Sequence, residues 1–178
     1  MPQKSKRTFQ KYDPEQDLLN YDFSYNDEET AALHQVMNNN ADVDINDLRR
    51  ISLWKIDRVL DIGEGTIEKI RELARMENVT VKDPFVKDIL EELVSSQGVG
   101  FPMASAILKF VKPEVFPIID VRAYRALTGK KPYYAMYSYD MYVDYAQQLK
   151  VNADRLGVPI SAMDEQLYCF DKRYNGKL

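Results

Sequence analysis

The sequence predicts an all-α fold of about seven or eight short helices joined by short connections. Apolar residues recur at the three- and four-residue spacing of an amphipathic helix along most of the 178 residues. The alternation of apolar and polar residues that is typical of strands is limited to brief pieces at 79–81 and 115–119. The sequence also contains no internal repeat and no low-complexity tract. We therefore expect one helical domain.

The composition is that of an ordinary globular protein. Hydrophobic residues make up 45% of the chain and charged residues 29%, which excludes wholesale disorder. The apolar runs are far shorter than the ~20 residues of a membrane span, and the N-terminus lacks the apolar centre of a cleavable signal. We therefore expect a cytoplasmic protein without a membrane partner.

Cysteine and histidine usage argues against metal and disulfide chemistry. Cys169 is the only cysteine, so the chain cannot form a disulfide framework, a four-cysteine zinc site or a cysteine-ligated iron–sulfur cluster. His34 is the only histidine and has no cysteine at ligand spacing. The sequence therefore predicts no metal site.

The first twelve residues contain four basic and no acidic side chains. Their pattern predicts no apolar face to bury, so we expect residues 1–12 to be a flexible basic tail. Contact of this tail with nucleic-acid phosphate is the alternative. Residues 13–178 are expected to form the helical domain.

The expected helices begin at acidic, capping or proline residues and end at glycine, asparagine or polar connections. Thr66 is expected to cap the third helix. Asp83 followed by Pro84 has the form of an N-cap and a first helical residue. The expected helices lie at about 27–37, 47–60, 66–74, 85–96, 102–112, 120–128, 134–156 and 159–174.

A turn with two glycines separates two of these helices at residues Gln97, Gly98, Val99 and Gly100. Glycines bring bare backbone close to a ligand, and the next helix begins with unpaired N–H groups that point outward. Such a turn is suited to bind an anion, and a nucleic-acid phosphate fits a shallow hairpin of this kind. The alternative is a tight helix–helix turn without a ligand. We expect these four residues to bind DNA phosphate.

Charge along the chain is uneven. The net charge of −4 argues against a protein that coats nucleic acid by charge alone. Residues 97–131, however, contain six basic and two acidic side chains, which predicts a basic patch beside the turn. Lys109 and Arg122 belong to this set and are expected to contact DNA phosphate. The alternative is that Arg122 and Arg125 pair with acidic residues inside the helical bundle.

The segment at 93–127 resembles the helix-hairpin-helix base-excision DNA glycosylases, the superfamily of endonuclease III and the adenine glycosylases. The resemblance rests on the Gly98-Val99-Gly100 turn, the helix with small residues that follows it, and Asp120 at the family's interval from the turn. It implies a hairpin at about 85–112 and an aspartate helix at about 120–128. In the family this aspartate stabilises positive charge on the sugar or activates water. The resemblance thus implies that Asp120 is catalytic, while a helix N-cap is its structural role.

The chain departs from this family where bifunctional members have a lysine, two residues after the second glycine. Pro102 stands there, and proline has no amine that could attack the sugar. Val121-Arg122 also stands where the family often has threonine–histidine, and the iron–sulfur cluster of some members cannot form. The resemblance implies no cofactor, apart from a monovalent cation that could bind the hairpin.

The implied function is that of a DNA-binding protein of this superfamily, with a monofunctional glycosylase as its enzymatic form. Such an enzyme would hydrolyse the N-glycosidic bond of a damaged or mismatched base after the base has left the duplex. The alternative is a non-enzymatic helix-hairpin-helix module that binds DNA or protein and has lost catalysis.

Six tyrosines lie within residues 132–145. Tyr134, Tyr137 and Tyr145 recur at helical spacing, which predicts a buried stripe on the long helix. Stacking on an extruded base is the alternative for one or two of them. Trp54 is expected in the core, with a place at the edge of the base pocket as its alternative.

Overall fold

A computed structural model describes residues 9–23, 27–38, 42–55, 62–96 and 98–178. No strand occurs within these ranges, so the prediction of an all-α fold is confirmed. None of the described helices is both long and apolar enough to cross a membrane. The helices are α1 (Asp27–Met37), α2 (Ile45–Lys55), α3 (Glu64–Arg75), α4 (Pro84–Ser95), α5 (Phe101–Val111), α6 (Val121–Thr128), the 3-10 turn η1 (Tyr134–Met136), α7 (Tyr139–Leu156) and α8 (Ile160–Tyr174).

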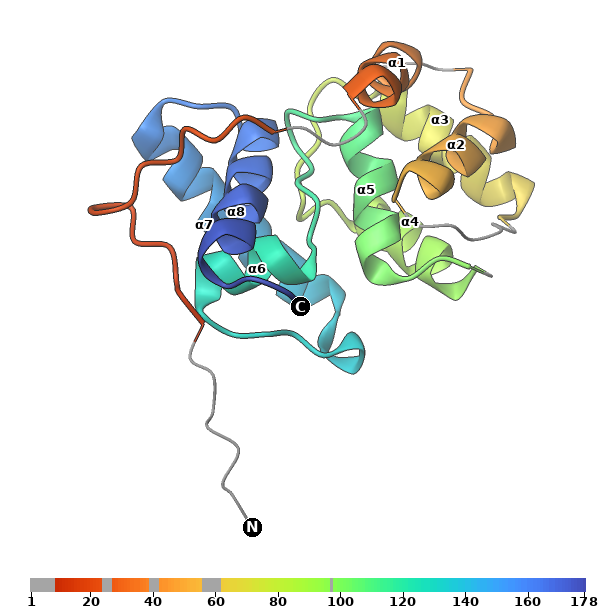
Figure 1. Cartoon of the computed structure of the whole chain (residues 1–178). Helices are drawn as coiled ribbons and strands as arrows, with labels where there is room; N and C mark the ends of the chain where they lie inside the picture. The colour runs from red at the N-terminus through yellow and green to blue at the C-terminus, as the bar shows by residue number, and fades with distance from the viewer. Residues whose placement is uncertain (1–8, 24–26, 39–41, 56–61, 97) are drawn as a thin grey trace.

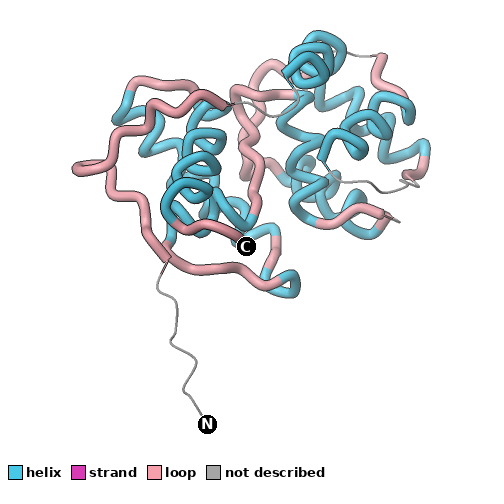
Figure 2. The backbone as a smooth tube through the Cα atoms, viewed as in Figure 1, coloured by secondary structure: helices cyan, strands magenta, loops and turns pink. Residues whose placement is uncertain are grey.

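The helices form two groups that lie side by side (Figure 1). Helices α1 to α5 make up one group, and α6 to α8 make up the other. The connection at 112–120 leads from α5 to α6 between the groups, and helices α4 and α7 also touch across the boundary. Loops run along the outside of the second group, including the chain at 9–23 (Figure 2). One hydrophobic cluster extends through both groups.

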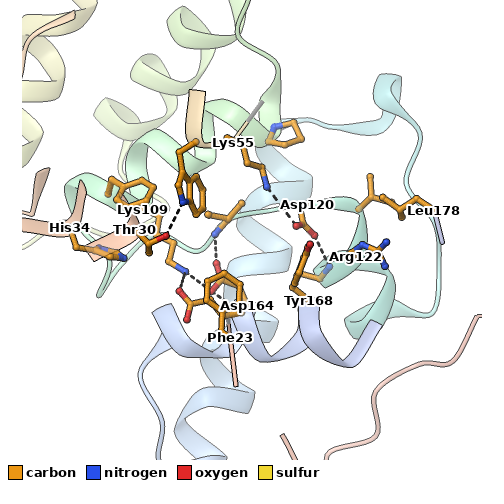
Figure 3. A pocket seen from close by; sticks show the side chains of 17 residues that line it. Phe23, Thr30, His34, Lys55, Lys109, Asp120, Arg122, Asp164, Tyr168 and Leu178 are labelled. Atoms are coloured by element: carbon orange, nitrogen blue, oxygen red, sulfur yellow. Dashed lines mark hydrogen bonds and ion pairs between the residues drawn. The ribbon is translucent and has the colours of Figure 1, made fainter. Parts of the chain in front are cut away.

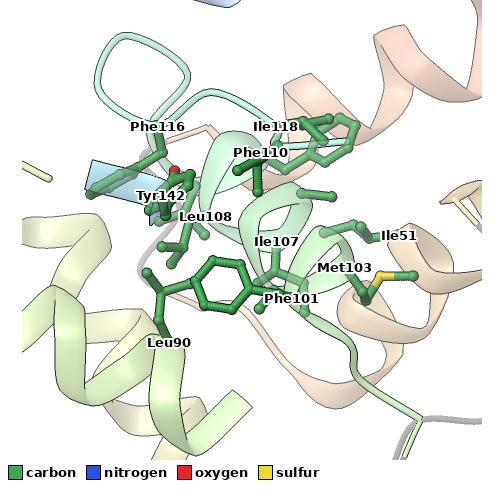
Figure 4. Close-up of a cluster of buried hydrophobic side chains, with 14 of the residues drawn as sticks. Ile51, Leu90, Phe101, Met103, Ile107, Leu108, Phe110, Phe116, Ile118 and Tyr142 are labelled. Atoms are coloured by element: carbon green, nitrogen blue, oxygen red, sulfur yellow. The ribbon is translucent and has the colours of Figure 1, made fainter. Parts of the chain in front are cut away.

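Helix α5 lies at the centre of the first group. Ten of its eleven side chains are buried, with Pro102 as the exception. A helix that is buried on all sides must be surrounded by other elements, and α5 packs against α1, α2, α3 and α4. Figure 4 shows Phe101 and Ile107 of α5 among side chains such as Leu90 of α4 and Ile51 of α2. This packing fixes the orientation of α5 and of its side chains.

The chain from Phe9 to Tyr12 is not a free tail. Tyr12 is 2% exposed, and its ring meets the edge of Phe170 with centroids 5.6 Å apart. Its backbone N–H donates to the carbonyl of Ala126 at 2.7 Å. The prediction of a flexible tail is therefore wrong at its end, because an aromatic ring buries enough apolar surface to hold the backbone. Residues 1–8 lie outside the described ranges.

Of two helix starts with a predicted cap, one follows its local signal and the other does not. Asp83 accepts a hydrogen bond from the Phe85 N–H at 2.9 Å and Pro84 is the first residue of α4, as predicted. Thr66, in contrast, does not cap α3, which begins at Glu64 after Gly63. The Thr66 hydroxyl donates to Glu92 on α4 at 2.9 Å instead. Of the predicted helix at 47–60, residues 56–60 lie outside the described residues.

The long helix α7 begins at Tyr139, later than predicted. Ser138 accepts from the Met141 N–H at 3.2 Å and provides the cap. Tyr134 therefore lies in η1 before this helix and is 73% exposed, so the predicted buried stripe is wrong at this position. Tyr142 and Tyr145 face the core and are fully buried.

Candidate functional site

A cavity of about 380 Å³ lies where α1, α2 and α5 face α6 and α8 (Figure 3). This volume is within the range of small-molecule binding sites. Aromatic side chains from five different segments form much of its wall, and charged side chains lie between them. The aromatic residues are Phe23, His34, Trp54, Phe110 and Tyr168, and the charged ones are Lys55, Lys109, Asp120, Arg122, Asp164 and Glu165.

Asp120 lies at the start of α6 and in the wall of this cavity. Its Oδ1 accepts a hydrogen bond from the Ala123 N–H at 2.7 Å, so its role as an N-cap is confirmed. Its Oδ2 lies 3.7 Å from the ammonium nitrogen of Lys55, and the Asp120 side chain is 17% exposed. Capping therefore orients the carboxylate through one oxygen and leaves the other facing the lysine.

The connection that leads to Asp120 is held by hydrogen bonds from both helix groups. The buried hydroxyls of Tyr142 and Tyr145 on α7 donate to the carbonyls of Pro117 and Ile118 at 3.0 and 2.9 Å. The Ile119 N–H donates to the Ser105 hydroxyl of α5 at 3.1 Å. The backbone before Asp120 is thereby fixed on both sides.

Lys109 lies in a buried charged cluster in the cavity wall. Its ammonium group donates to Asp164 at 2.8 Å, to Glu165 at 2.9 Å and to the Ser161 carbonyl at 2.8 Å. The Lys109 side chain is 3% exposed. The prediction that Lys109 contacts DNA phosphate is therefore wrong: its hydrogen-bonding positions are occupied by protein acceptors.

Burial alters the ionisation of this cluster. It raises the pKa of the Asp164 carboxyl to about 6, although Lys109 and the Ile118 N–H oppose the change. Burial would lower the pKa of Lys109, but Asp164 and Glu165 outweigh it and raise that pKa. Burial, together with the charge of Lys109, lowers the pKa of His34. His34 packs on Phe110 with ring centroids 4.8 Å apart, so we interpret it as a neutral wall residue.

Arg122 and Arg125 of α6 both bind Asp171 of α8. Arg125 contacts both carboxylate oxygens at 2.6 Å, and the side chains of Arg125 and Asp171 are fully buried. Arg122 donates to Asp171 at 3.1 Å and to the Gly176 carbonyl at 2.9 Å, while its guanidinium group lies over Tyr168. The alternative that these arginines pair inside the bundle is confirmed, and Arg122 is 16% exposed at the cavity.

The predicted basic patch beside the turn does not form as expected. Lys109, Lys112 and Arg125 are at most 5% exposed, and Arg122 is held by Asp171. Of the six basic residues in that segment, only the pair Lys130 and Lys131 is exposed. Charge counting failed here because it cannot tell a surface cation from a buried one.

The two glycines of the turn between α4 and α5 have different backbone conformations and surroundings. Gly98 has a φ of +80°, a conformation that strains other residues. Gly100 precedes α5 with extended backbone, and a Cβ atom there would lie 3.3 Å from the Tyr134 ring. Val99 between them is buried, while Gln97 lies outside the described residues. Phosphate contact by Gln97, Gly98, Val99 and Gly100 stays a prediction.

Both the helix that follows the turn and the aspartate line the same cavity. Pro102, in the first turn of α5, forms part of the wall that also contains Asp120. Lys55 of α2 completes this edge, and Figure 3 shows its side chain directed toward Asp120. Sequence reasoning missed Lys55, because it follows a core tryptophan in an amphipathic helix and no local pattern relates it to Asp120.

The indole N–H of Trp54 donates to the Thr30 hydroxyl at 2.8 Å, and its ring meets the edge of Phe110. Trp54 is thus a core residue that also borders the cavity.

Among the described residues, no three His, Cys, Asp or Glu side chains are grouped so that they could hold a metal ion. Comparison of the chain with family models, with curated proteins and with solved structures finds no match.

Proposed function

We propose that the protein is a DNA glycosylase that hydrolyses the N-glycosidic bond of a damaged or mismatched base, with Asp120 as its catalytic carboxylate. One observation carries the proposal. Asp120 lines an aromatic-walled cavity of about 380 Å³, and the same wall contains the first turn of the helix that follows the double-glycine turn. This is the arrangement that the resemblance to helix-hairpin-helix glycosylases implies.

The chemistry of the bond favours such a wall. Breaking an N-glycosidic bond develops positive charge on the sugar, and a fixed carboxylate stabilises that charge or takes a proton from the attacking water. The capping bond to Ala123 fixes the Asp120 carboxylate before any substrate arrives. The partly exposed aromatic side chains of Phe23 and Tyr168 in the wall offer apolar surface on which an extruded base can stack.

For DNA contact the proposal depends on the turn at 98–100 and on the loop beside it. Lys130 and Lys131 are exposed there and are followed by Tyr133 and Tyr134, which are 72% and 73% exposed. Cations next to exposed aromatic rings suit a phosphate backbone with unstacked bases. A monovalent cation at the turn belongs to the proposal as well.

The alternative function is a non-enzymatic module that binds DNA or protein. In such a module the aspartate would be closed off, for example by an ion pair with Arg122 or Arg125. Both arginines bind Asp171 instead. The second oxygen of Asp120 faces Lys55 across a longer contact of 3.7 Å, and the Asp120 side chain stays 17% exposed in the cavity wall. This difference favours the enzymatic function.

The test is release of a base from duplexes that contain uracil, alkylated bases, 8-oxoguanine or a mismatch, with alkali to reveal abasic sites. Asp120→Asn should lower the rate by about 10²-fold or more, since the amide keeps the cap but loses the charge. Asp83→Asn is the matched control, because Asp83 also caps a helix and lies outside the cavity wall. It should release base like the wild type.

Two results would overturn this function. Equal rates for the wild type and Asp120→Asn would remove the catalytic role of Asp120. Salt-sensitive DNA binding by the wild type without base release from any duplex would leave the non-enzymatic module as the function.

A further inference from the structure

The cavity contains an amine that the proposed hydrolysis does not require. Lys55 is the last residue of α2, and its Nζ lies 3.7 Å from Asp120 Oδ2. Its side chain is 19% exposed, so the amine borders the cavity without being sealed from it. Asp120 is its one ion-pair partner in the part of the chain that the structure describes.

The second lysine in the wall is in a different state. Lys109 has three acceptors within 2.9 Å and is 3% exposed, so its amine is committed to the protein. Freeing it would leave Asp164 buried without its partner. Among the described residues, Lys55 has one ion pair, which is longer, and this pair joins it to the carboxylate that would face the sugar. If an amine acts in this cavity, it is Lys55.

We propose that Lys55 is a nucleophile toward abasic DNA, which gives the protein a lyase activity in addition to base release. The inference rests on the proposed DNA substrate. Pro102 excludes a nucleophile from the first turn of α5, yet Lys55 enters the same cavity from α2. The amine that α5 lacks at Pro102 is thereby supplied by α2.

The reaction balances without a further reactant. Lys55 passes a proton to Asp120, and its amine attacks C1′ of the ring-opened sugar. Asp120 returns this proton to the hydroxyl of the adduct, which leaves as water while the C=N bond forms. Asp120 accepts a proton from C2′, the C3′–O bond breaks, and the 3′ phosphate leaves with the electron pair. Water then hydrolyses the C=N bond and returns the amine to Lys55. Asp120 lies beside the amine, where a base for the C2′ proton is required.

The experiment uses a duplex with a preformed abasic site, made by removal of uracil, and borohydride to reduce any C=N bond. The wild type should form a covalent protein–DNA adduct, and mass spectrometry should place it on Lys55. Lys55→Arg keeps a cation beside Asp120 but has no amine that forms this bond, so the adduct should fall at least about tenfold. Lys69→Arg is the control, since Lys69 pairs with Asp88 and Glu92 outside the cavity.

Three results would overturn the role of Lys55: no adduct with the wild type, an adduct on another amine, or equal trapping by Lys55→Arg. Matching urea unfolding curves show that Lys55→Arg is folded. Because the abasic site is supplied, trapping does not depend on base excision. Base release without an adduct would retain the proposed glycosylase function and exclude the role of Lys55. An adduct on Lys55 without base release would retain the role of Lys55 and exclude the glycosylase function.

Discussion

The Nζ atom of Lys109 lies 2.8 Å from Oδ1 of Asp164, and both side chains are 3% exposed. This ion pair joins α5 of the first helix group to α8 of the second, in the wall of the cavity. The other oxygen of Asp164 accepts from the Ile118 N–H at 2.7 Å. One carboxylate therefore holds both helix groups and the connection that leads to Asp120.

Removal of the lysine should destabilise the protein strongly. Lys109→Met leaves Asp164 buried without its main countercharge, and the free energy of unfolding should fall by about 3–5 kcal/mol. Urea denaturation followed by circular dichroism measures this loss. Lys150→Met is the control, because the pair of Lys150 with Asp154 is exposed and should contribute less than about 1 kcal/mol. A similar small loss in Lys109→Met would contradict the importance of the buried pair.

Acidification should stabilise the wild type relative to Asp164→Asn. The pKa of Asp164 is about 6 in the folded protein, against an ordinary value of 3.8. From about pH 7 to about pH 5 the folded protein therefore binds a proton that the unfolded chain does not, so its free energy of unfolding gains from the lower pH. The gain over the variant should reach about 1 kcal/mol in denaturant titrations at the two pH values. A relative loss would instead indicate a lowered pKa.

Tyr145→Phe should loosen the connection before Asp120. The change leaves the buried carbonyl of Ile118 without its hydrogen bond from α7, which should cost about 1–3 kcal/mol. Thermal unfolding measures the loss, and base release should slow because Asp120 is less well positioned. Tyr133→Phe, at a position 72% exposed, should change stability by less than about 0.5 kcal/mol. Equal effects of the two changes would show that the Tyr145 hydroxyl does not hold the connection.

The turn between α4 and α5 should not tolerate a side chain at Gly98. Its φ of +80° is strained for alanine, so Gly98→Ala should lower the free energy of unfolding by about 1 kcal/mol or more. Gly65→Ala is the matched control. Gly65 lies in α3, a Cβ atom there would meet no other atom within 4 Å, and alanine favours a helix. That change should stabilise the protein by about 0.5–1 kcal/mol. Calorimetry of both variants measures these changes. A melting temperature of Gly98→Ala equal to that of the wild type would show that the turn is not strained by a side chain.

Local chemistry made part of this structure predictable from sequence. Helical periodicity predicted the all-α fold, because the burial of one helix face depends on neighbours three and four residues apart. The start of α4 at Asp83-Pro84 and the cap at Asp120 followed from the same kind of local signal, a side-chain oxygen that binds an N–H within three residues. Such contacts are formed within one turn of chain, so sequence alone determined them.

Contacts between distant residues were decided by the tertiary structure. Thr66 had a capping signal, yet its hydroxyl binds Glu92 of the next helix. Lys109 and Arg122 look like surface cations in sequence, but their partners Asp164 and Asp171 lie 55 and 49 residues away. Lys55 and Asp120 likewise meet only because α2 and α6 face one cavity. Burial and ion pairing depend on which helices pack together, and no spacing along the chain specifies that.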